Sequence, residues 1–288
     1  MKIGLLNLEP KYKNLAIEKL RLYHMNLGNT VEDYMPLAYE SYDKIYCSSI
    51  FTFTPKRNLP PNAICGGTGF DLITKLPSEI EAINPHLNFG FTTRGCIRVC
   101  PFCVVHIKEG HKVVIVAKLK DIWNGVKGAI ITLYDNNILA LVDHFFSICA
   151  ESKEYHVKLD INQGLDHRLL NQAICQELAS ISHAEYHFAF DSPAYYKSVD
   201  KAIKLLQENR INRSIWYVLV GYDTSFQEDL DRLNFLRDRG QNAYVQRYVR
   251  KPEYIPLARW ANQHHIFQGM TWEQFLNHPK NKHRNLEV

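Results

Sequence analysis

Hydrophobic and polar residues along the chain predict alternating strands and helices. A short apolar run over residues 2–8 has the length of a buried strand, and residues 14–27 carry apolar side chains at helical spacing. Gly28-Asn29 is typical of a helix end, and residues 43–51 predict a second strand. We therefore expect a small Rossmann-like βαβ extension over residues 1–60. No G-x-G-x-x-G sequence follows the first strand, so the extension is predicted to hold no cofactor.

A stiff polar segment, Pro55–Pro61, is the predicted boundary between this extension and the rest of the chain. It is followed by Cys65-Gly66-Gly67-Thr68-Gly69-Phe70-Asp71, which has three glycines in four positions. Glycine lets the backbone adopt positive φ or approach another group closely. Two interpretations stay open for this segment: a tight connection, or a nest that faces a phosphate or substrate.

Beyond residue 86 the same pattern recurs about six times, with short apolar strands separated by amphipathic helices. Such alternation predicts parallel pairing with right-handed crossovers. We expect an α/β fold in which residues 61–250 form a partial (β/α)6 barrel and residues 251–288 form a helical tail that covers it. The predicted strands are residues 88–93, 128–134, 156–161, 185–190, 215–220 and 243–249.

Three cysteines, Cys96, Cys100 and Cys103, lie at C-x3-C-x2-C spacing directly after the first of these strands. They fit on one loop, and thiolates favour iron–sulfur clusters, zinc and copper(I). Zinc would need a fourth ligand, for which His106 or His111 is available, but no second cysteine knuckle exists in the sequence. The spacing favours a cluster in which three cysteines leave one iron without a protein ligand.

This motif, with Phe102 immediately before its last cysteine, resembles the signature of the radical SAM superfamily. The resemblance covers residues 86–250. It implies a partial barrel, a 4Fe–4S cluster on Cys96, Cys100 and Cys103, and S-adenosylmethionine bound to the open iron. It also implies an enzyme that generates a 5′-deoxyadenosyl radical, with an external electron donor of the flavodoxin or ferredoxin type.

Polar residues follow successive predicted strands, at the face where parallel α/β barrels carry their reactive groups. By the resemblance, either Asp135 or Asn136 would accept the methionyl amino group of the cofactor. The amides of Asn162 and Gln163 would bind its ribose, and Arg168 would pair with its carboxylate. Helix capping by Asn162 or Asp166 is the structural alternative for this segment.

A narrower likeness rests on the segments GGTGFD, TTRGC, LYDNN and NQGLDHR. Together they resemble the lyases of queuine salvage, which release queuine from queuosine or its 5′-phosphate. That resemblance implies a small nucleoside or nucleotide substrate. We expect the heterocycle to contact Asp191 and Asp223, and we expect Arg247 and Arg250 to bind one phosphate. Helix caps and a solvated basic edge are the alternatives for these four residues.

Two other functions stay open. Modification of tRNA, such as methylthiolation, is disfavoured because the tail is too short for an RNA-binding β-barrel and only two cysteines precede the motif. The second is a non-enzymatic iron–sulfur or zinc interaction module, which the polar strand ends argue against.

Composition agrees with an ordinary globular protein, since 46% of residues are hydrophobic and 22% are charged. A net charge of +4 permits a phosphate-bearing substrate but does not favour extensive RNA binding, so tRNA is not the expected partner. No apolar run is long enough to span a bilayer. The apolar stretch near the first residue is too short for a signal peptide, because polar residues follow it closely. The four cysteines outside the motif are scattered singly, as expected of reduced thiols in the cytoplasm.

Overall fold

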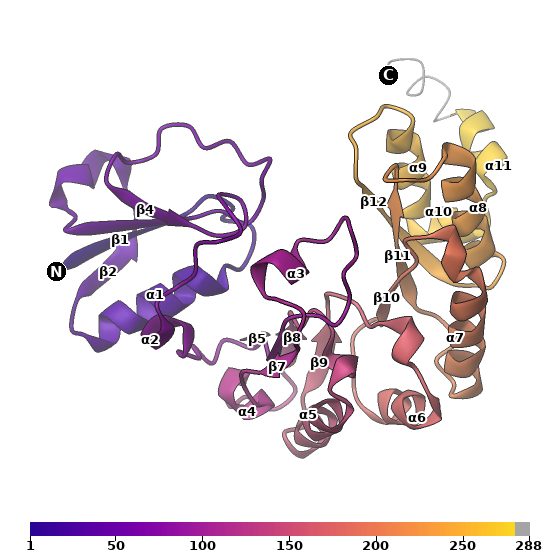
Figure 1. The fold of residues 1–288 in the computed structure, drawn as a ribbon, viewed down its shortest axis with the longest axis horizontal. Coiled ribbons are helices and arrows are strands. Elements are labelled where there is room, and N and C mark those ends of the chain that lie inside the picture. Colours follow the sequence, from indigo (N-terminus) through magenta and orange to yellow (C-terminus); the bar gives the residue numbers. More distant parts are fainter. Residues whose placement is uncertain (280–288) are drawn as a thin grey trace.

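The computed structural model describes residues 1–279, which form a mixed α/β structure with parallel sheets and helices. Figure 1 shows an N-terminal sheet on one side and two further sheets that continue through the rest of the chain. The predicted α/β class is confirmed. Residues 280–288 of the predicted tail lie outside the described part of the chain.

The N-terminal sheet has four parallel strands in the order β2-β1-β3-β4. Helix α1 (Leu15–Asn26) begins where the side chain of Asn14 accepts a hydrogen bond from the backbone of Ile17. A second short helix, α2 (Ser78–Glu81), packs on α1. The strands are β1 (Lys2–Asn7), β2 (Thr30–Asp33), β3 (Lys44–Ser48) and β4 (Ala63–Gly66), with a 3-10 helix, η1 (Pro36–Ser41), between β2 and β3.

The βαβ prediction for residues 1–60 is therefore incomplete. It missed β2, which is only four residues long and carries the polar sequence Thr-Val-Glu-Asp. It also placed the boundary inside the sheet, because Pro55–Pro61 lies between β3 and β4 and does not lead out of the sheet. Ile80 of α2 belongs to the same small core as Ile3 and Leu5, so the N-terminal unit extends beyond residue 66.

Six parallel strands follow in two three-stranded sheets, β5-β8-β9 and β10-β11-β12. Two isolated parallel bridges, Leu159 to His183 and Leu165 to Phe188, lie between the sheets. The strands are β5 (Phe89–Gly90), β8 (Ile130–Leu133), β9 (Lys158–Ile161), β10 (His187–Ala189), β11 (Ile215–Val220) and β12 (Asn242–Arg247). All six predicted strands are present, although β5 is much shorter than expected.

Helices lie along the outer side of these strands, and short α3 (Val105–Lys108) lies on the opposite, inner side (Figure 1). The outer helices are α4 (Leu119–Ile122), α5 (Val142–Glu154), α6 (Gln172–Ser180), α7 (Tyr196–Glu208) and α8 (Phe226–Arg237). Short 3-10 turns precede three of them: η2 (Ile138–Ala140), η3 (His167–Leu169) and η4 (Pro193–Tyr195).

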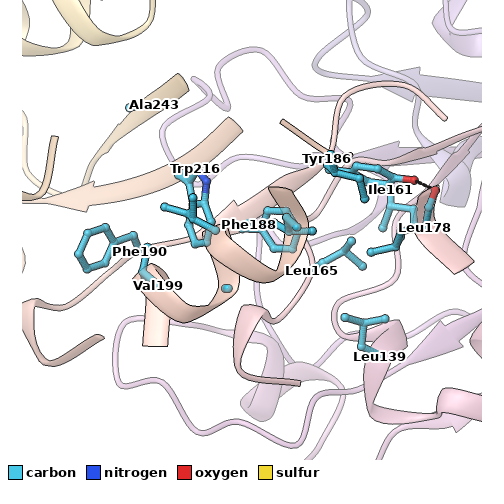
Figure 2. Close-up of a cluster of buried hydrophobic side chains, with 14 of the residues drawn as sticks. Leu139, Ile161, Leu165, Leu178, Tyr186, Phe188, Phe190, Val199, Trp216 and Ala243 are labelled. Carbon is cyan, nitrogen blue, oxygen red and sulfur yellow. Dashed lines mark hydrogen bonds between the residues drawn. The ribbon is translucent and has the colours of Figure 1, made fainter. Parts of the chain in front are cut away.

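The main core fills the space between strands and outer helices. Phe188 and Trp216 stack with ring centroids 5.0 Å apart, and neither is exposed. Figure 2 shows them among aliphatic side chains such as Leu165 and Val199. Alternate residues of each strand point into this core, as expected when helices cover one face of a sheet.

A fully buried ion pair joins α8 to two strand ends. The guanidinium of Arg232 donates to Asp229, to the carbonyl of Leu219 in β11 and to the carbonyl of Phe190 after β10. Asp229 also accepts from the backbone of Gly221 at 3.0 Å. Buried charges require such partners, and here they fix the carboxyl ends of two adjacent strands.

The C-terminal residues are helical, as predicted, and pack on the last strand. They form α9 (Tyr254–Ala261), α10 (His264–Gly269) and α11 (Trp272–Asn277). Trp260 and Phe267 are fully buried in the main core. Across residues 1–279, no helix has both the length and the apolar character needed to cross a membrane.

Candidate functional site

The three cysteines lie on a loop whose two ends are held together. Strand β6 (Thr93–Arg94) pairs with the antiparallel β7 (Val114–Ile115), so the intervening residues form a closed loop. Gly95 has φ of +89°, and a side chain there would collide with the carbonyl oxygen of Lys112. Only glycine fits at the start of the cysteine motif.

A buried carboxylate fixes the approach to this loop. Asp135, which is fully buried, accepts hydrogen bonds of 2.5–3.0 Å from the backbone N–H and hydroxyl groups of both Thr92 and Thr93. Burial raises the pKa of Asp135, while these hydrogen bonds act in the opposite direction. Of the two predicted cofactor acceptors, Asp135 is thus occupied within the protein, and Asn136 is the one with exposed surface.

Glu109 closes the other side of the loop. Its carboxylate accepts from the backbone of Gly95 at 2.9 Å and from the side-chain amide of Asn136 at 2.7 Å. It also pairs with the guanidinium of Arg94 at 3.0 Å. The sequence did not identify Glu109, because nothing local distinguishes it from a solvated acid on a short helix.

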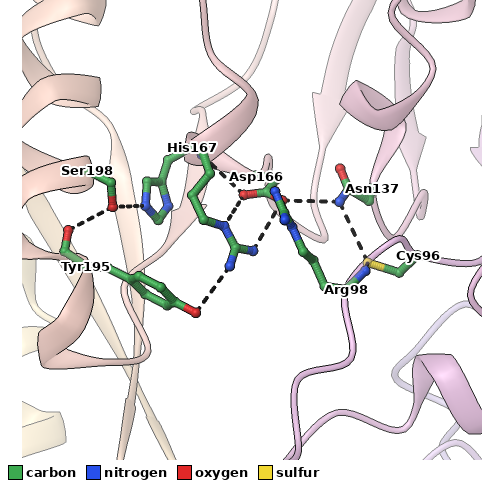
Figure 3. Close-up of polar contacts among 8 residues, drawn as sticks. Cys96, Arg98, Asn137, Asp166, His167, Tyr195 and Ser198 are labelled. Atoms are coloured by element: carbon green, nitrogen blue, oxygen red, sulfur yellow. Dashed lines mark hydrogen bonds and ion pairs between the residues drawn. The ribbon is translucent and has the colours of Figure 1, made fainter.

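Asp166 connects the cysteine loop to the end of β9 (Figure 3). Its side chain is only 6% exposed and accepts from Arg98 of the motif at 2.7 Å. It accepts from Arg168 at 2.7 and 3.2 Å and from the amide of Asn137 at 3.3 Å. Burial alone would raise the pKa of Asp166, but hydrogen bonds from Arg168 and Arg98 outweigh burial and lower it.

The geometry changes the picture of Arg168. Its guanidinium is already paired with Asp166, and it also donates to the hydroxyl of Tyr195 at 3.2 Å. A carboxylate of a bound cofactor would therefore be a second carboxylate partner of Arg168, beside Asp166. Asp166 also accepts from the backbone N–H of Arg168 and so caps η3, which confirms the capping alternative for this residue. That alternative did not include the ion pairs of Asp166 with Arg98 and Arg168.

All three cysteines are free and partly exposed. Burial raises the pKa of Cys100 and the pKa of Cys103. The thiols of Cys96 and Cys103 raise the pKa of Cys100 further. Cys96 accepts from the backbone of Arg98 at 3.4 Å. The three thiols share the loop between the paired strands β6 and β7. A bound cation would reverse the repulsion between their thiolates.

Aromatic contacts hold the far end of the loop against two strand ends. Phe102, the residue before the last cysteine, packs edge-to-face on Tyr222 after β11, with ring centroids 5.5 Å apart. Tyr222 in turn packs on Tyr248 after β12 at 4.8 Å. The loop thus contacts the ends of β8, β9 and β11, and Tyr248 after β12 supports Tyr222.

Asn137 has a buried side-chain oxygen without a hydrogen-bond partner, next to the cysteine loop. It is 2% exposed, its amide nitrogen lies 3.7 Å from the Cys96 sulfur, and its side-chain oxygen is buried without a hydrogen-bond partner. Orphaned buried acceptors are costly and point to a missing donor. No three His, Cys, Asp or Glu side chains of residues 1–279 form a ready-made metal site. A group that carries an N–H donor, bound beside Cys96, would satisfy the oxygen of Asn137.

The remaining predicted site residues divide into two groups. Asp191 is close enough to Cys100 and Cys103 to affect the pKa of each thiol, and burial raises its own pKa to about 6. It accepts from the backbone of Leu219 at 3.3 Å. The other predicted residues are exposed and lie outside the network around Asp166: Asn162, Gln163, Asp223, Arg247 and Arg250. The guanidinium of Arg250 lies 4.9 Å from the ring centroid of Phe53.

The glycine-rich segment after β4 favours the tight-connection interpretation. Gly67 and Gly69 pack against the loop after β3, and a side chain on either would collide with Ser49. Thr68 between them accepts a hydrogen bond from Lys108 of the cysteine loop. The segment therefore brings the N-terminal unit into contact with the cysteine loop.

Comparison with models of known protein families gave no match, and comparison with curated proteins gave no related sequence. The function is therefore inferred from the geometry of the residues described above.

We predict that Asp166→Asn lowers the free energy of unfolding by about 2 kcal/mol at neutral pH, because two guanidinium groups lose a charged acceptor. Since the folded-state pKa of Asp166 is lowered, this contribution is complete above about pH 4 and is lost as the pH falls through that lowered value. Urea denaturation of both proteins between pH 3 and 7 measures it. A difference that stays constant over this range would contradict the ion-pair assignment.

Proposed function

We propose that this chain is a radical SAM enzyme whose 4Fe–4S cluster is held by Cys96, Cys100 and Cys103. The observation that carries the proposal is the juxtaposition of three partly exposed thiols on one pinned loop with the unsatisfied oxygen of Asn137. The other cysteines lie outside this loop: Cys47 and Cys65 belong to the N-terminal sheet, and Cys149 and Cys175 to the main core. The loop itself therefore offers three thiolates and no fourth.

When bound, the reduced cluster and S-adenosylmethionine would supply a 5′-deoxyadenosyl radical that abstracts hydrogen from the substrate. The protein's own groups hold and orient these partners. Asn137 and Asn136 offer amide groups beside the cysteine loop, in place of the predicted Asp135. Arg98 and Arg168 provide positive charge next to the cysteines, with Asp166 fixing both guanidinium groups.

The fold supports this proposal through its strand order. Sheets β5-β8-β9 and β10-β11-β12, with the isolated bridges between them, are consistent with one curved row of six parallel strands. We propose that this row is the partial (β/α)6 barrel of the radical SAM family. In such a barrel the chemistry takes place at the carboxyl ends of the strands, which is where the cysteine loop lies here.

For the substrate we propose a small nucleoside or nucleotide, with queuine release from queuosine or its 5′-phosphate as the reaction. Asp191 is a partly buried carboxyl group close enough to Cys100 and Cys103 to affect their pKa values, and it offers acceptors for ring N–H groups or an amine. Arg247 and Arg250 are exposed at and after the end of β12 and are available for one phosphate. An electron donor of the flavodoxin or ferredoxin type would reduce the cluster. We propose that the protein acts in the cytoplasm.

A zinc site is the second candidate, and one observation favours it. His106 and His111 lie within the cysteine loop with ring centroids 5.8 Å apart, and Nδ1 of His106 is buried without a partner. A Cys3His site would satisfy that nitrogen. Metal analysis separates the two candidates, since a zinc protein is colourless.

We predict that anaerobic reconstitution gives a brown protein with about four irons per chain. Cys100→Ala should lose most of the iron and the associated visible absorption, because only two ligands remain. Cys149→Ala is the control, since that thiol lies in the main core. If Cys65→Ala removes the iron as completely as Cys100→Ala, the ligand assignment is wrong.

We further predict that reconstituted, reduced enzyme with S-adenosylmethionine releases free queuine from queuosine 5′-phosphate. Formation of 5′-deoxyadenosine should depend on that substrate, because hydrogen abstraction from the ribose precedes cleavage. Asp191→Asn should lower kcat/KM about tenfold or more, as expected for loss of a charged hydrogen bond worth about 1.5–3 kcal/mol. Mass spectrometry measures both products. Uncoupled 5′-deoxyadenosine without base release would refute the lyase reaction.

A further inference from the structure

The inner face of the six strands is distinct from the packed face under the helices. Residues at alternate positions, such as Leu159 and Ile161 of β9, are buried in the main core. The intervening residues therefore point to the opposite side, toward α3 and the cysteine loop (Figure 1). In a closed barrel such inward side chains fill the interior completely.

Here they do not fill it. Ile130 of β8 is 54% exposed and Tyr244 of β12 is 45% exposed, although each belongs to a strand with a buried opposite face. Large apolar and aromatic groups left open on an inward face offer surface to a ligand.

Four side chains form a row across this face on adjacent strands: Asp160, His187, Tyr217 and Tyr244. The rings of His187 and Tyr217 are nearly parallel, with centroids 5.2 Å apart, and Tyr244 meets Tyr217 edge-on at 5.9 Å. Asp160 is near enough to raise the pKa of Tyr217, which burial brings to about 12. The row therefore combines aromatic surfaces with one carboxylate.

Two imidazole atoms in this region lack partners. Nδ1 of His187 is buried without a hydrogen bond, and so is Nε2 of His264 on α10. Burial lowers the pKa of His187, and His264 adds to that effect. Unsatisfied buried nitrogens beside exposed aromatic surface indicate a polar ligand or water that completes their hydrogen bonds.

Asp160 is the acidic group of the row. Thr132 donates to it at 3.2 Å, and among residues 1–279 no ion pair involves it. Lys158 is on the same face of β9, one pleat nearer the amino end, where its charge acts on His183. A partly exposed carboxylate of this kind favours a cationic or N–H-rich group.

We infer that this row binds the base of the substrate, a flat heterocycle that carries a protonated amine. The inference deepens the proposed function and rests on it, because queuine is a deazaguanine with an amine in its side chain. The aromatic residues would stack on the heterocycle, Asp160 would pair with the amine, and His187 would hydrogen-bond the ring edge. Asp160 then determines specificity by contacting the side-chain amine of the base, and Asp191 beside the cysteines is left for the ring N–H groups.

Binding of two probes tests this directly. Isothermal titration of the anaerobically reconstituted full chain should show that 7-aminomethyl-7-deazaguanine binds about tenfold more tightly than 7-deazaguanine, a difference of about 1.4 kcal/mol. Asp160→Asn should abolish that difference and leave the affinity for 7-deazaguanine within about twofold, since only the charge is removed. Tyr244→Ala should weaken both probes about tenfold, because it removes stacking surface.

Asp143→Asn, on the exposed side of α5, is the matched control and should keep the wild-type discrimination. Thermal melting and visible absorption verify that each variant is folded and carries its cluster. Discrimination that survives Asp160→Asn, or a wild type that binds neither probe, would overturn the inference. If Asp160-dependent binding is found but no base is released from queuosine 5′-phosphate, the binding site stands and the lyase reaction fails. If base is released but Asp160→Asn leaves the discrimination unchanged, the lyase reaction stands and the binding site fails.

Discussion

One buried carboxylate, that of Asp166, determines how the cysteine loop sits on the strands. It pairs with Arg98 inside the motif and with Arg168 after β9, and it accepts from Asn137 after β8. A carboxylate with so little exposure needs charged partners, and each partner here comes from a different segment. The loop therefore cannot move away from the strand ends without breaking the ion pair between Arg98 and this buried carboxylate.

Local patterns predicted the elements well wherever each element carries its own periodicity. Strand β11 was predicted with its observed bounds, and the helices after it follow from their apolar spacing. Strand β2 was missed because its short polar sequence acquires strand structure only by pairing with β1. The glycines at 67 and 69 were recognised, but their reason, close contact with Ser49, depends on a strand pairing that the sequence does not reveal.

The sequence predicted one loop for the three cysteines because their spacing is local. The requirement for Gly95 before them is not local, since it comes from the carbonyl of Lys112 near the other end of the loop. By contrast, Asp135 was one of two residues expected to accept from a cofactor, although its acceptors are used by Thr92 and Thr93, more than forty positions earlier. Arg168 was expected to be free to bind a carboxylate of the cofactor, because Asp166 had been considered only as a helix cap and not as the ion-pair partner of Arg168. Pairings between distant segments decide which polar groups remain available for a ligand.

We propose that three cysteines hold a cluster with one iron open to S-adenosylmethionine. Electron paramagnetic resonance of the dithionite-reduced, reconstituted full chain, with and without S-adenosylmethionine, tests it most directly. We expect a signal from a reduced 4Fe–4S cluster whose g-values shift when S-adenosylmethionine is added, since the cofactor becomes an iron ligand. A cluster signal that S-adenosylmethionine leaves unchanged, or a protein that binds zinc and gives no signal, would contradict it.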